Sequence, residues 1–236
     1  MRKKIRALLL SAGFGTRLRP ITNSIPKCLV DVGGKPLLAW WLESLEKIGC
    51  EAVLINTHYL HEKVLDFISS WEEKGMKIET TYEENLLGTA GTLLVNKNFF
   101  IGCDILMIHT DNFTSMDLND LLQANINRPL NCLLTMLTFE SSNPQSCGIV
   151  ITDKENIVQN FFEKELSPPS NIANGAIYMF NDELIDFINQ NYSDSVDFSN
   201  DVIPNLMGRI FTYHTNEIFI DIGTPENLKI VQSLCK

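Results

Sequence analysis

The chain has 236 residues, of which 44% are hydrophobic and 20% are charged, an ordinary composition for a globular protein. This length suffices for one sizeable α/β domain, or for a core with a small appended lobe. The formal net charge of −10, from 19 basic and 29 acidic residues, argues against nucleic acid or an anionic membrane surface as a partner.

The six cysteines are spread along the chain, and no two of them form a Cys-x-x-Cys element. Neither a zinc site nor a redox motif is therefore indicated, and free thiols in a reducing cytoplasm are expected. Basic residues up to Arg6 precede a short apolar run at Ala7–Leu10, which is too short for the core of a secretion signal. No stretch approaches the length needed to span a membrane, so a cytoplasmic location is expected.

The first part of the chain alternates predicted strands and helices. Strands are expected at Ile5–Leu10, Ala52–Asn56 and Lys77–Tyr82, and helices from Pro36 to Ile48 and from His61 to about Lys74. This order predicts a parallel sheet with right-handed crossovers. Ligands of such sheets gather at the carboxyl ends of the strands.

The remainder of the chain is less regular, and the section from about residue 131 onward is expected to form a substrate lobe. The expected strands of this remainder are Ile105–His109, Asn131–Phe139, Gly148–Ile151, Ile157–Phe162, Asn174–Phe180 and Ile210–Tyr213. Its expected helices are Thr92–Val95, Leu118–Ile126, one capped by Asp182, and a last one that starts at the turn Gly223-Thr224-Pro225.

The first strand leads into a loop of small residues, followed by the cations Arg17, Arg19 and Lys27. Backbone N–H groups with cations behind them form a site for phosphate groups. A dinucleotide fingerprint would need a third glycine where Leu18 stands, and a Walker A ending is absent. The residues assigned to nucleotide binding here are Leu10, Ser11, Ala12, Gly13, Phe14, Gly15, Thr16, Arg17 and Lys27.

The run from Ser11 to Pro20, carried on to Ile25-Pro26-Lys27, resembles the signature of the sugar-phosphate nucleotidyltransferases, or nucleotide-sugar pyrophosphorylases. The resemblance extends over nearly the whole chain. It implies transfer of a nucleoside monophosphate from a nucleoside triphosphate to a sugar 1-phosphate, with release of pyrophosphate. It also implies a Rossmann-like three-layer α/β/α sandwich with a mostly parallel central sheet and a small β-rich sugar-binding lobe.

The resemblance implies a single nucleotidyltransferase domain over residues 1–236. Its nucleotide-binding half would cover about 1–130 and its sugar-phosphate-binding half about 131–236. Many family members continue into a left-handed β-helix of hexapeptide repeats. No such repeat occurs in this sequence, so neither acyl transfer nor a β-helix trimer is expected, and a monomer or small homo-oligomer is.

Two further segments carry the resemblance on the nucleotide side. The run Leu87-Gly88-Thr89-Ala90-Gly91 resembles the family's base-recognising loop, in which Leu87, Gly88 and Thr89 would meet the edge of the nucleobase. Asp111 follows the strand that ends at His109, and a carboxylate there is a reasonable ligand for Mg²⁺. Family members usually carry glycine where this chain has Thr110.

The segment Ile218–Leu228 contains Asp221, an acid between apolar residues on a predicted strand. A lone carboxylate in that setting is costly unless it is paired or metal-bound. Asp221 and Asp111 are therefore predicted to bind the metal together. On the substrate side, the resemblance implies that Asn112, Glu163, Lys164, Asn174 and Asp221 meet the sugar phosphate, although Asn174-Gly175-Ala176 departs slightly from the family's usual order.

The resemblance assigns catalytic roles to three cations. Arg17 would hold the β- and γ-phosphates, Lys27 would lie at the α-phosphate, and Lys164 would neutralise the incoming sugar phosphate. Mg²⁺ is the expected cofactor, and a nucleoside triphosphate and a sugar 1-phosphate are the expected substrates.

Several alternatives stay open. Phe14 and the Leu87–Gly91 loop look most like the guanylyltransferases acting on mannose 1-phosphate, so GTP is favoured, whereas uridylyl or thymidylyl transfer is an alternative. Cys28 stands where most sugar enzymes have proline, and Pro-Lys-Cys is reminiscent of cytidylyltransferases with phosphocholine-like acceptors. A hypothesis of another class is a catalytically silent module that binds a nucleotide sugar.

Overall fold

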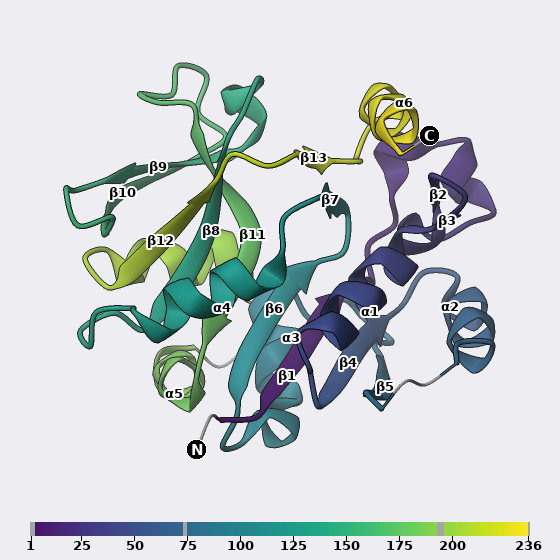
Figure 1. The fold of residues 1–236 in the computed structure, drawn as a ribbon, viewed down its shortest axis with the longest axis horizontal. Helices are drawn as coiled ribbons and strands as arrows, with labels where there is room; N and C mark the ends of the chain where they lie inside the picture. The colour runs from purple at the N-terminus through teal and green to yellow at the C-terminus, as the bar shows by residue number, and fades with distance from the viewer. Residues whose placement is uncertain (1–2, 73–74, 193–195, 236) are drawn as a thin grey trace. The chain divides into compact units, whose positions relative to one another are not determined.

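The computed structural model describes residues 3–72, 75–192 and 196–235, and it divides into two compact units that the chain enters more than once. The N-terminal unit comprises Ile5–Leu86, Ile108–Leu118 and the segment from Ile218 onward. The middle unit comprises Leu87–Met107 and Asn119–Glu217, with the residues up to Lys4. Figure 1 traces these segments by colour. The units differ from two halves divided near residue 130, because the last segment of the chain belongs with the first.

Three parallel strands form the centre of the N-terminal unit: β1 (Ile5–Leu10), β4 (Ala52–Thr57) and β5 (Lys77–Tyr82). Leu8 lies opposite Leu54, and Leu54 lies opposite Glu79. Consecutive apolar residues in β1 are buried, as expected of a strand covered on both faces. The predicted parallel arrangement of these strands is confirmed.

The helices α1 (Leu37–Lys47) and α2 (His61–Ser69) connect these strands. Before α1, β2 (Asp31–Val32) and β3 (Lys35–Pro36) form a short hairpin. Helix α2 ends earlier than predicted, and Lys74 lies outside the described residues. The hydroxyls of Ser69 and Ser70 donate hydrogen bonds to the carbonyls of Asp66 and Phe67, which offers these carbonyls a partner other than a continuing helix.

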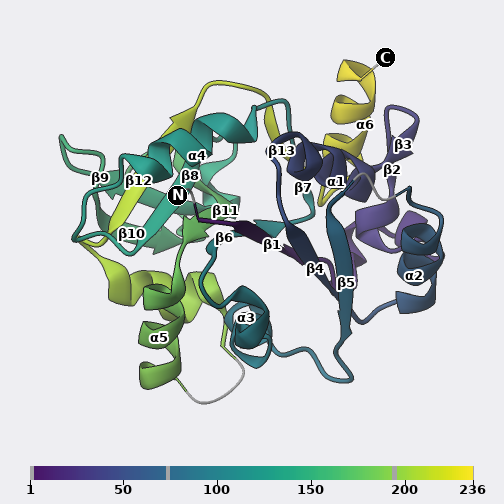
Figure 2. The same ribbon diagram turned by 60° about the horizontal axis from the view of Figure 1, so that its bottom comes forward.

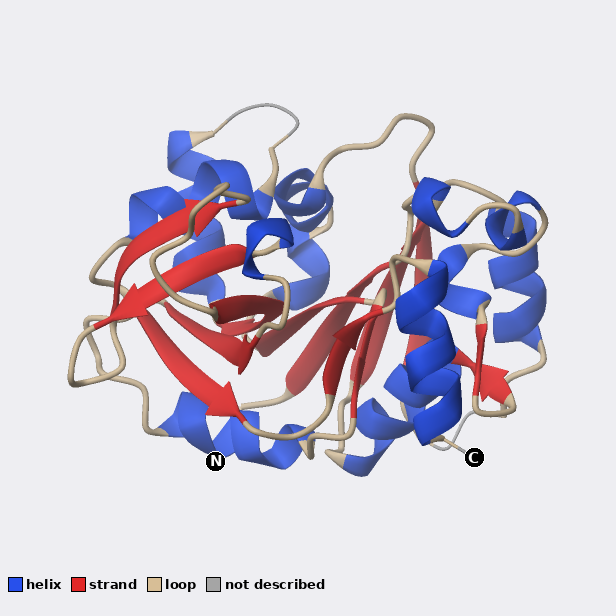
Figure 3. Cartoon of the chain, turned by 90° about the horizontal axis from the view of Figure 1, so that it is seen from above, coloured by secondary structure: helices blue, strands red, loops and turns tan. Residues whose placement is uncertain are grey.

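A second pairing in the N-terminal unit joins segments that are distant in sequence. Strand β6 (Asp104–His109) leads into β7 (Asn112–Thr114), and β7 pairs antiparallel with β13 (Phe219–Asp221). In this register Asp221 lies opposite Asn112. Helix α6 (Pro225–Leu234) follows, with Thr224 as its N-cap. Strands and helices are distinguished by colour in Figure 3.

The middle unit is rich in strands. It contains β8 (Leu134–Glu140), β9 (Gly148–Thr152), β10 (Val158–Glu163), β11 (Ile172–Phe180) and β12 (Ile210–Thr215). Strand β11 pairs antiparallel with β8 and β9, β10 pairs antiparallel with β9, and β12 pairs parallel with β8. The expected β-rich lobe is therefore present in this unit.

The helices associated with the middle unit are α3 (Thr89–Val95), α4 (Leu118–Ile126) and α5 (Asp182–Asn191), and α3 lies beside α5 in Figure 2. Helix α3 begins before the predicted Thr92. The predicted cap of α5 was wrong by one residue, because Asn181 rather than Asp182 accepts a hydrogen bond from the N–H of Glu183. An amide and a carboxylate both suit an N-cap, so adjacent candidates are hard to separate from sequence.

The mixed α/β class with a Rossmann-like parallel arrangement is confirmed. All six cysteines are free thiols, and Cys28, Cys50, Cys103 and Cys132 are buried. Within the part of the chain that the structure describes, the helices are all too short or too polar to cross a membrane.

Candidate active site

The loop after β1 is anchored at its first residue. The backbone N–H of Ser11 donates a hydrogen bond to Oδ1 of Asn56 at 2.6 Å, and the Ser11 hydroxyl lies 3.1 Å from that of Thr110. The Thr110 hydroxyl also donates to the carbonyl of Leu10 at 2.8 Å. Thr110 therefore ties the end of β6 to the end of β1, and the Ser11 amide already has a partner within the protein.

The middle of this loop is open at one glycine and closely packed at the next. A Cβ added at Gly13 would meet nothing within 4 Å, so the backbone there borders open space. Gly15 has a φ of +61°, and a Cβ there would lie 3.0 Å from Thr22 and 3.2 Å from the side chain of Lys27. The Thr22 hydroxyl donates to the Gly15 carbonyl at 2.7 Å. Only glycine fits both the backbone and the space at position 15.

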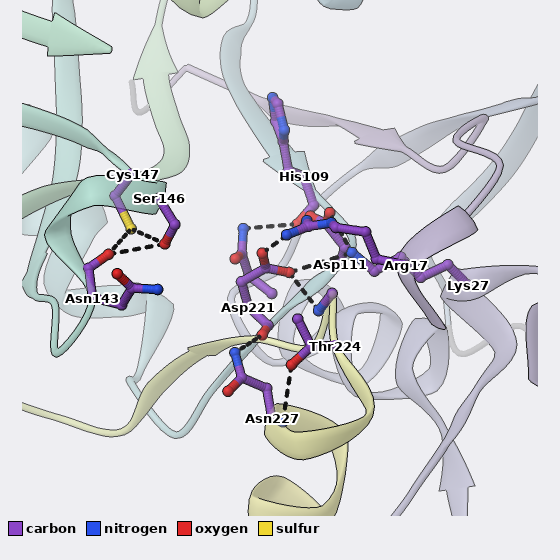
Figure 4. A network of polar contacts seen from close by, with 12 residues as sticks. Arg17, Lys27, His109, Asp111, Asn143, Ser146, Cys147, Asp221, Thr224 and Asn227 are labelled. Atoms are coloured by element: carbon purple, nitrogen blue, oxygen red, sulfur yellow. Dashed lines mark hydrogen bonds and ion pairs between the residues drawn. The ribbon is translucent and has the colours of Figure 1, made fainter. Parts of the chain in front are cut away.

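Two cations and two carboxylates meet beyond the loop (Figure 4). Nζ of Lys27 lies 2.7 Å from Oδ2 of Asp111 and 3.3 Å from Oδ1 of Asp221. Nη2 of Arg17 lies 3.3 Å from Oδ2 of Asp221. Because both carboxylates contact the same ammonium, their nearer oxygens are at most about 6 Å apart. The predicted gathering of these four side chains is thus observed within the N-terminal unit.

The backbone around Asp221 is fixed by several hydrogen bonds. The N–H of Gly223 donates to Oδ1 of Asp221 at 2.7 Å, and Nδ2 of Asn227 donates to the Asp221 carbonyl at 2.7 Å. The N–H of Ile222 donates to the Asp111 carbonyl at 2.9 Å. The segments that carry the two acids are therefore bonded directly to each other, which holds both carboxylates within reach of the Lys27 ammonium.

The surroundings of Asp111 stabilise its charged form. Lys27 is the most enclosed of the four, with 12% of its side chain exposed, against 61% for Arg17. Burial by itself would raise the pKa of Asp111, but the Lys27 ammonium, with a smaller contribution from His109, lowers that pKa below its ordinary value. Asp111 is thus held as a carboxylate.

Asn112 and Cys28 follow Asp111 and Lys27 in the sequence, and both have hydrogen-bond partners within the protein. Nδ2 of Asn112 donates to the His109 carbonyl at 3.3 Å, and the Asn112 carbonyl accepts from the indole N–H of Trp41 at 3.0 Å. Cys28 is buried, and burial raises the pKa of its thiol to about 12 despite a hydrogen bond with Ser11. The thiol at this position therefore packs against the loop in its neutral form.

The predicted base-recognising loop lies in the middle unit and is bound to residues 196–198. Gly88 has a φ of +76°, and a Cβ there would lie 2.5 Å from the Val196 carbonyl oxygen. That carbonyl accepts hydrogen bonds from the N–H groups of Ala90 and Gly91, and the Leu87 carbonyl accepts one from the N–H of Val196. The hydroxyl of Thr89 accepts from the N–H of Phe198 at 2.7 Å. The close approach that requires glycine here is to the protein's own backbone.

The predicted sugar-phosphate residues of the middle unit have local partners. Nζ of Lys164 lies 3.3 Å from Oε1 of Glu163, and the Lys164 side chain is 67% exposed on a backbone with a φ of +52°. Asn174 donates from Nδ2 to the Tyr178 hydroxyl at 2.7 Å, and its Oδ1 accepts from the N–H of Ala176 at 2.9 Å. Asn174 thus holds an irregular section of β11, where Ala176 has a φ of +51°.

The structure therefore separates the predicted site residues into two groups. Leu10–Arg17, Lys27, Asp111, Asn112 and Asp221 belong to the N-terminal unit, whereas Leu87–Thr89, Glu163, Lys164 and Asn174 belong to the middle unit. The charged cluster is formed entirely from the first group.

Sequence reasoning missed the residues that support the cluster: Thr22, Asn56, Glu83, Gly223 and Asn227. Asn56 donates from Nδ2 to Oε1 of Glu83 at 2.8 Å, and both side chains are buried. A polar residue that ends an apolar strand is a signal that could have identified Asn56. Thr22 and Asn227 carry no such signal, because their roles depend on segments that meet only after folding.

Asp111 and Asp221 could hold a divalent cation. They offer hard oxygen donors, and magnesium is commonly bound by one or two carboxylates together with substrate phosphates. Among residues 3–72, 75–192 and 196–235, no group of three or more His, Cys, Asp or Glu side chains is arranged as a metal site. The donor set thus fits a cation whose remaining ligands come from water and substrate.

Comparison with known proteins places this geometry in context. Residues 6–234 match the family described as nucleotidyl transferase. A Sulfolobus acidocaldarius protein with the provisional name mannose-1-phosphate guanyltransferase is 31% identical, over 94% of this chain and 61% of its own length. The mannose-1-phosphate guanylyltransferase catalytic subunit beta of Drosophila melanogaster is 29% identical, over 94% of this chain and 60% of its own length. The chain thus spans about three fifths of the length of these curated relatives.

Solved structures show the same fold. A Bacillus anthracis protein provisionally named as a glucose-1-phosphate thymidylyltransferase gives a TM-score of 0.88 at 20% identity, covering 98% of this chain and 95% of its own. HddC from Yersinia pseudotuberculosis gives 0.82 at 24% identity, covering 98% and 99% of the two chains. HddC has also been solved in complex with GMP-PN.

Proposed function

Because the chain belongs to the nucleotidyl transferase family, we propose that it transfers a nucleoside monophosphate from a nucleoside triphosphate to a sugar 1-phosphate. The observation that carries the proposal is the cluster of Arg17, Lys27, Asp111 and Asp221. Its members come from three separate stretches of sequence, around residues 17–27, 111 and 221, yet they share a network of ion pairs. Such a cluster suits a ligand that brings several negative charges and a cation.

In the proposed reaction, an oxygen of the sugar 1-phosphate forms a bond to the α-phosphorus of the nucleotide. The bond from that phosphorus to the β-phosphate oxygen breaks, and its electron pair leaves with pyrophosphate. The nucleophile is already an anion, so the reaction needs no general base. The protein has to bring anions together in line and stabilise charge as it shifts.

We assign the triphosphate to the N-terminal unit. Arg17 is 61% exposed and uses Nη2 for a weak surface ion pair with Asp221 at 3.3 Å, so its remaining N–H donors can meet a β- or γ-phosphate while it stays beside Asp221. Lys27 is more enclosed and lies between two carboxylates, so we assign it to the α-phosphate, where its position stays fixed through the reaction. The Ser11 amide serves the loop rather than the ligand, because Asn56 already accepts its hydrogen bond.

We propose that Asp111 and Asp221 hold Mg²⁺ when the substrates are bound. The ion would supply positive charge to the phosphate oxygens. The depressed pKa of Asp111 keeps that side chain in the anionic form that a cation requires. With the nucleotide bound, phosphate charge would compensate the cations Lys27 and Arg17.

We assign the sugar phosphate to the middle unit through Lys164. Its exposed ammonium contacts a carboxylate oxygen of Glu163 at the surface, so it can reach a phosphate at small cost. We assign the nucleobase to the Leu87–Thr89 loop, whose backbone is held by residues 196–198. Asn174 acts in this scheme by shaping β11, because both ends of its amide are bonded to Tyr178 and Ala176.

Guanine is the favoured base, and mannose 1-phosphate or a related sugar is the favoured acceptor. The support is the naming of the Sulfolobus and Drosophila relatives, which match over 94% of this chain. Cys28 leaves a cytidine nucleotide with another acceptor as the second candidate. Its buried neutral thiol packs against Ser11 at the start of the loop.

The test is release of pyrophosphate across a panel of nucleoside triphosphates and sugar 1-phosphates, each with and without Mg²⁺. We expect the largest rate with GTP, mannose 1-phosphate and magnesium together. Release with CTP and phosphocholine, and with no other pair of substrates, would support the second candidate. Tight binding of a nucleotide sugar without any release would instead support a catalytically silent module.

A further inference from the structure

Gly223 lies where Arg17 meets Asp221. Its N–H donates to Oδ1 of Asp221 at 2.7 Å, while Nη2 of Arg17 lies 3.3 Å from Oδ2 of the same carboxylate. Oδ1 of Asp221 thus contacts the Gly223 amide and the Lys27 ammonium, whereas Oδ2 contacts the Arg17 guanidinium. This arrangement orients the carboxylate, because each oxygen has a different donor.

A side chain at position 223 would occupy the space that the guanidinium fills. An added Cβ would lie 2.5 Å from Nη2 and 2.9 Å from Cζ of Arg17, and 2.9 Å from Oδ1 of Asp221. Carbon atoms do not approach other heavy atoms this closely, so something must move. Gly223 is not among the residues with a positive φ, and alanine can therefore adopt its backbone without strain.

Of the atoms near position 223, those of Arg17 can move most easily. The Arg17 side chain is long and 61% exposed, whereas the Asp221 carboxylate is short and also contacts Lys27 and the Gly223 amide. A methyl group at 223 would therefore displace mainly the guanidinium, which it meets most closely, and it would push Oδ1 of Asp221 by a smaller shift. Since the displaced group is at the surface, the fold should tolerate the change.

We propose that Gly223 is a positioning residue for Arg17: the absence of a side chain at 223 holds open the place from which the guanidinium binds the triphosphate. This inference rests on the proposed function, because it assigns Arg17 to that ligand. Gly223 makes no contact with the nucleotide in this scheme and acts only through Arg17. The two residues should therefore behave as one unit in binding.

The test is a double-mutant cycle with Gly223→Ala, Arg17→Ala and the double variant, with affinity measured by calorimetry. The probes are inorganic tripolyphosphate and a non-hydrolysable GTP analogue, each with Mg²⁺. A hydrogen bond to a charged group contributes enough that either single change should weaken binding roughly 10- to 100-fold. The double variant should bind no more weakly than Arg17→Ala alone. The KM for the sugar 1-phosphate should not change.

A matched control uses Arg17→Lys, whose single ammonium lacks the planar fork that meets the added Cβ. In that background Gly223→Ala should cost less than threefold in affinity. If Gly223→Ala fails to fold while the double variant folds, that outcome would still support the inference, because it would show that the steric clash at position 223 is with the Arg17 side chain. A double variant that also fails to fold, or additive losses of affinity, would overturn it.

The outcome also separates this inference from the proposed function. A wild-type chain that binds neither probe would contradict the proposed function. In that case a crystal structure of the Gly223→Ala variant still reports whether the guanidinium has left Asp221. A variant that binds both probes as tightly as wild type, or that keeps Arg17 against Asp221, would refute the positioning role alone.

Discussion

The charged cluster of the N-terminal unit and the Glu163–Lys164 pair of the middle unit handle charge differently. In the cluster, Lys27 contacts two carboxylates, and the segments of Asp111 and Asp221 are bonded to each other. In the pair, Lys164 contacts a neighbour in sequence at 3.3 Å, and most of its side chain is in solvent.

This difference indicates two kinds of binding surface. The cluster is organised before any ligand arrives, because its charges compensate one another and its backbone is fixed. A charged ligand must then compete with the ion pairs inside the cluster. Its binding therefore depends on several charged groups of the ligand acting together. An exposed lysine pays little desolvation and can be recruited singly. We expect changes in the cluster to affect chemistry and changes in the pair to affect capture of one substrate.

The largest effect is expected from Asp221→Ala. The substitution removes the carboxylate that faces both Arg17 and Lys27, and with it one of the two proposed metal ligands. Loss of one group that stabilises charge in a transition state typically costs about 10²–10³ in rate, and pyrophosphate release should fall by at least that factor. Asp221 is 43% exposed, so the melting temperature should change little.

Glu226→Ala is the matched control, since it removes the same charge from an exposed position in α6, five residues further along the chain. It should keep wild-type activity. Equal losses in both variants would mean that net charge, and not the position of Asp221, controls the rate.

Gly88→Ala is expected to act on stability first. The residue has a φ of +76°, and the new methyl group would meet the Val196 carbonyl oxygen at 2.5 Å, a backbone atom that cannot swing aside. With a ψ of 161°, this backbone lies in a region essentially restricted to glycine, which costs another residue on the order of 1–3 kcal/mol, and the clash should add about 1–3 kcal/mol to the loss in free energy of unfolding. Chemical denaturation measures this loss.

Gly102→Ala is a control that places alanine at a positive φ without a clash. Gly102 belongs to the same unit and has a φ of +73°, but an added Cβ there would meet nothing within 4 Å. A larger loss for Gly88→Ala would reflect the contact with Val196 together with the glycine-only backbone at position 88. A difference near zero would show that the base loop is not held against residues 196–198.

Lys164→Ala should give a smaller change that is confined to one substrate. If Lys164 contacts the sugar phosphate as proposed, its removal should raise the KM for the sugar 1-phosphate roughly tenfold, the scale of one charge-assisted hydrogen bond, and leave the KM for the nucleotide unchanged. Stability should stay within about 0.5 kcal/mol, because the ion pair with Glu163 is at the surface.

Initial rates with each substrate varied in turn separate the two KM values. Lys154→Ala, at another exposed lysine of the middle unit, controls for the change in net charge. An increase in the nucleotide KM for Lys164→Ala would contradict the division between cluster and pair.

The contrast between these regions also explains what the sequence could predict. Local patterns located β1, β4 and β5 closely, because apolar runs and turn residues act within a few positions. Asp111 could be predicted because it follows the end of an apolar strand, and Asp221 because it is an acid between apolar residues. The family resemblance supplied the expectation that they meet.

The supporting contacts could not be predicted in the same way. The need for glycine at 223 arises from Arg17, which lies more than two hundred positions earlier in sequence, and only the folded chain shows their proximity. The early end of α2 depended on hydroxyls of Ser69 and Ser70 that compete for helix carbonyls. Local sequence patterns do not reveal which residues distant in sequence come into contact in the folded protein.

The smallest expected effect concerns the reactivity of Cys28, which reports how rigidly the N-terminal loop is held. Burial raises the pKa of its thiol to about 12, so at pH 8 only about one molecule in 10⁴ would carry the reactive thiolate. Alkylation followed by peptide mapping should label Cys147, which is only partly buried, long before Cys28. Because the pKa is raised, the rate at Cys28 should increase about tenfold per pH unit above neutrality while the fold persists. Labelling of Cys28 as fast as Cys147 would mean that the loop opens readily, and the cluster behind it could not then be considered preformed.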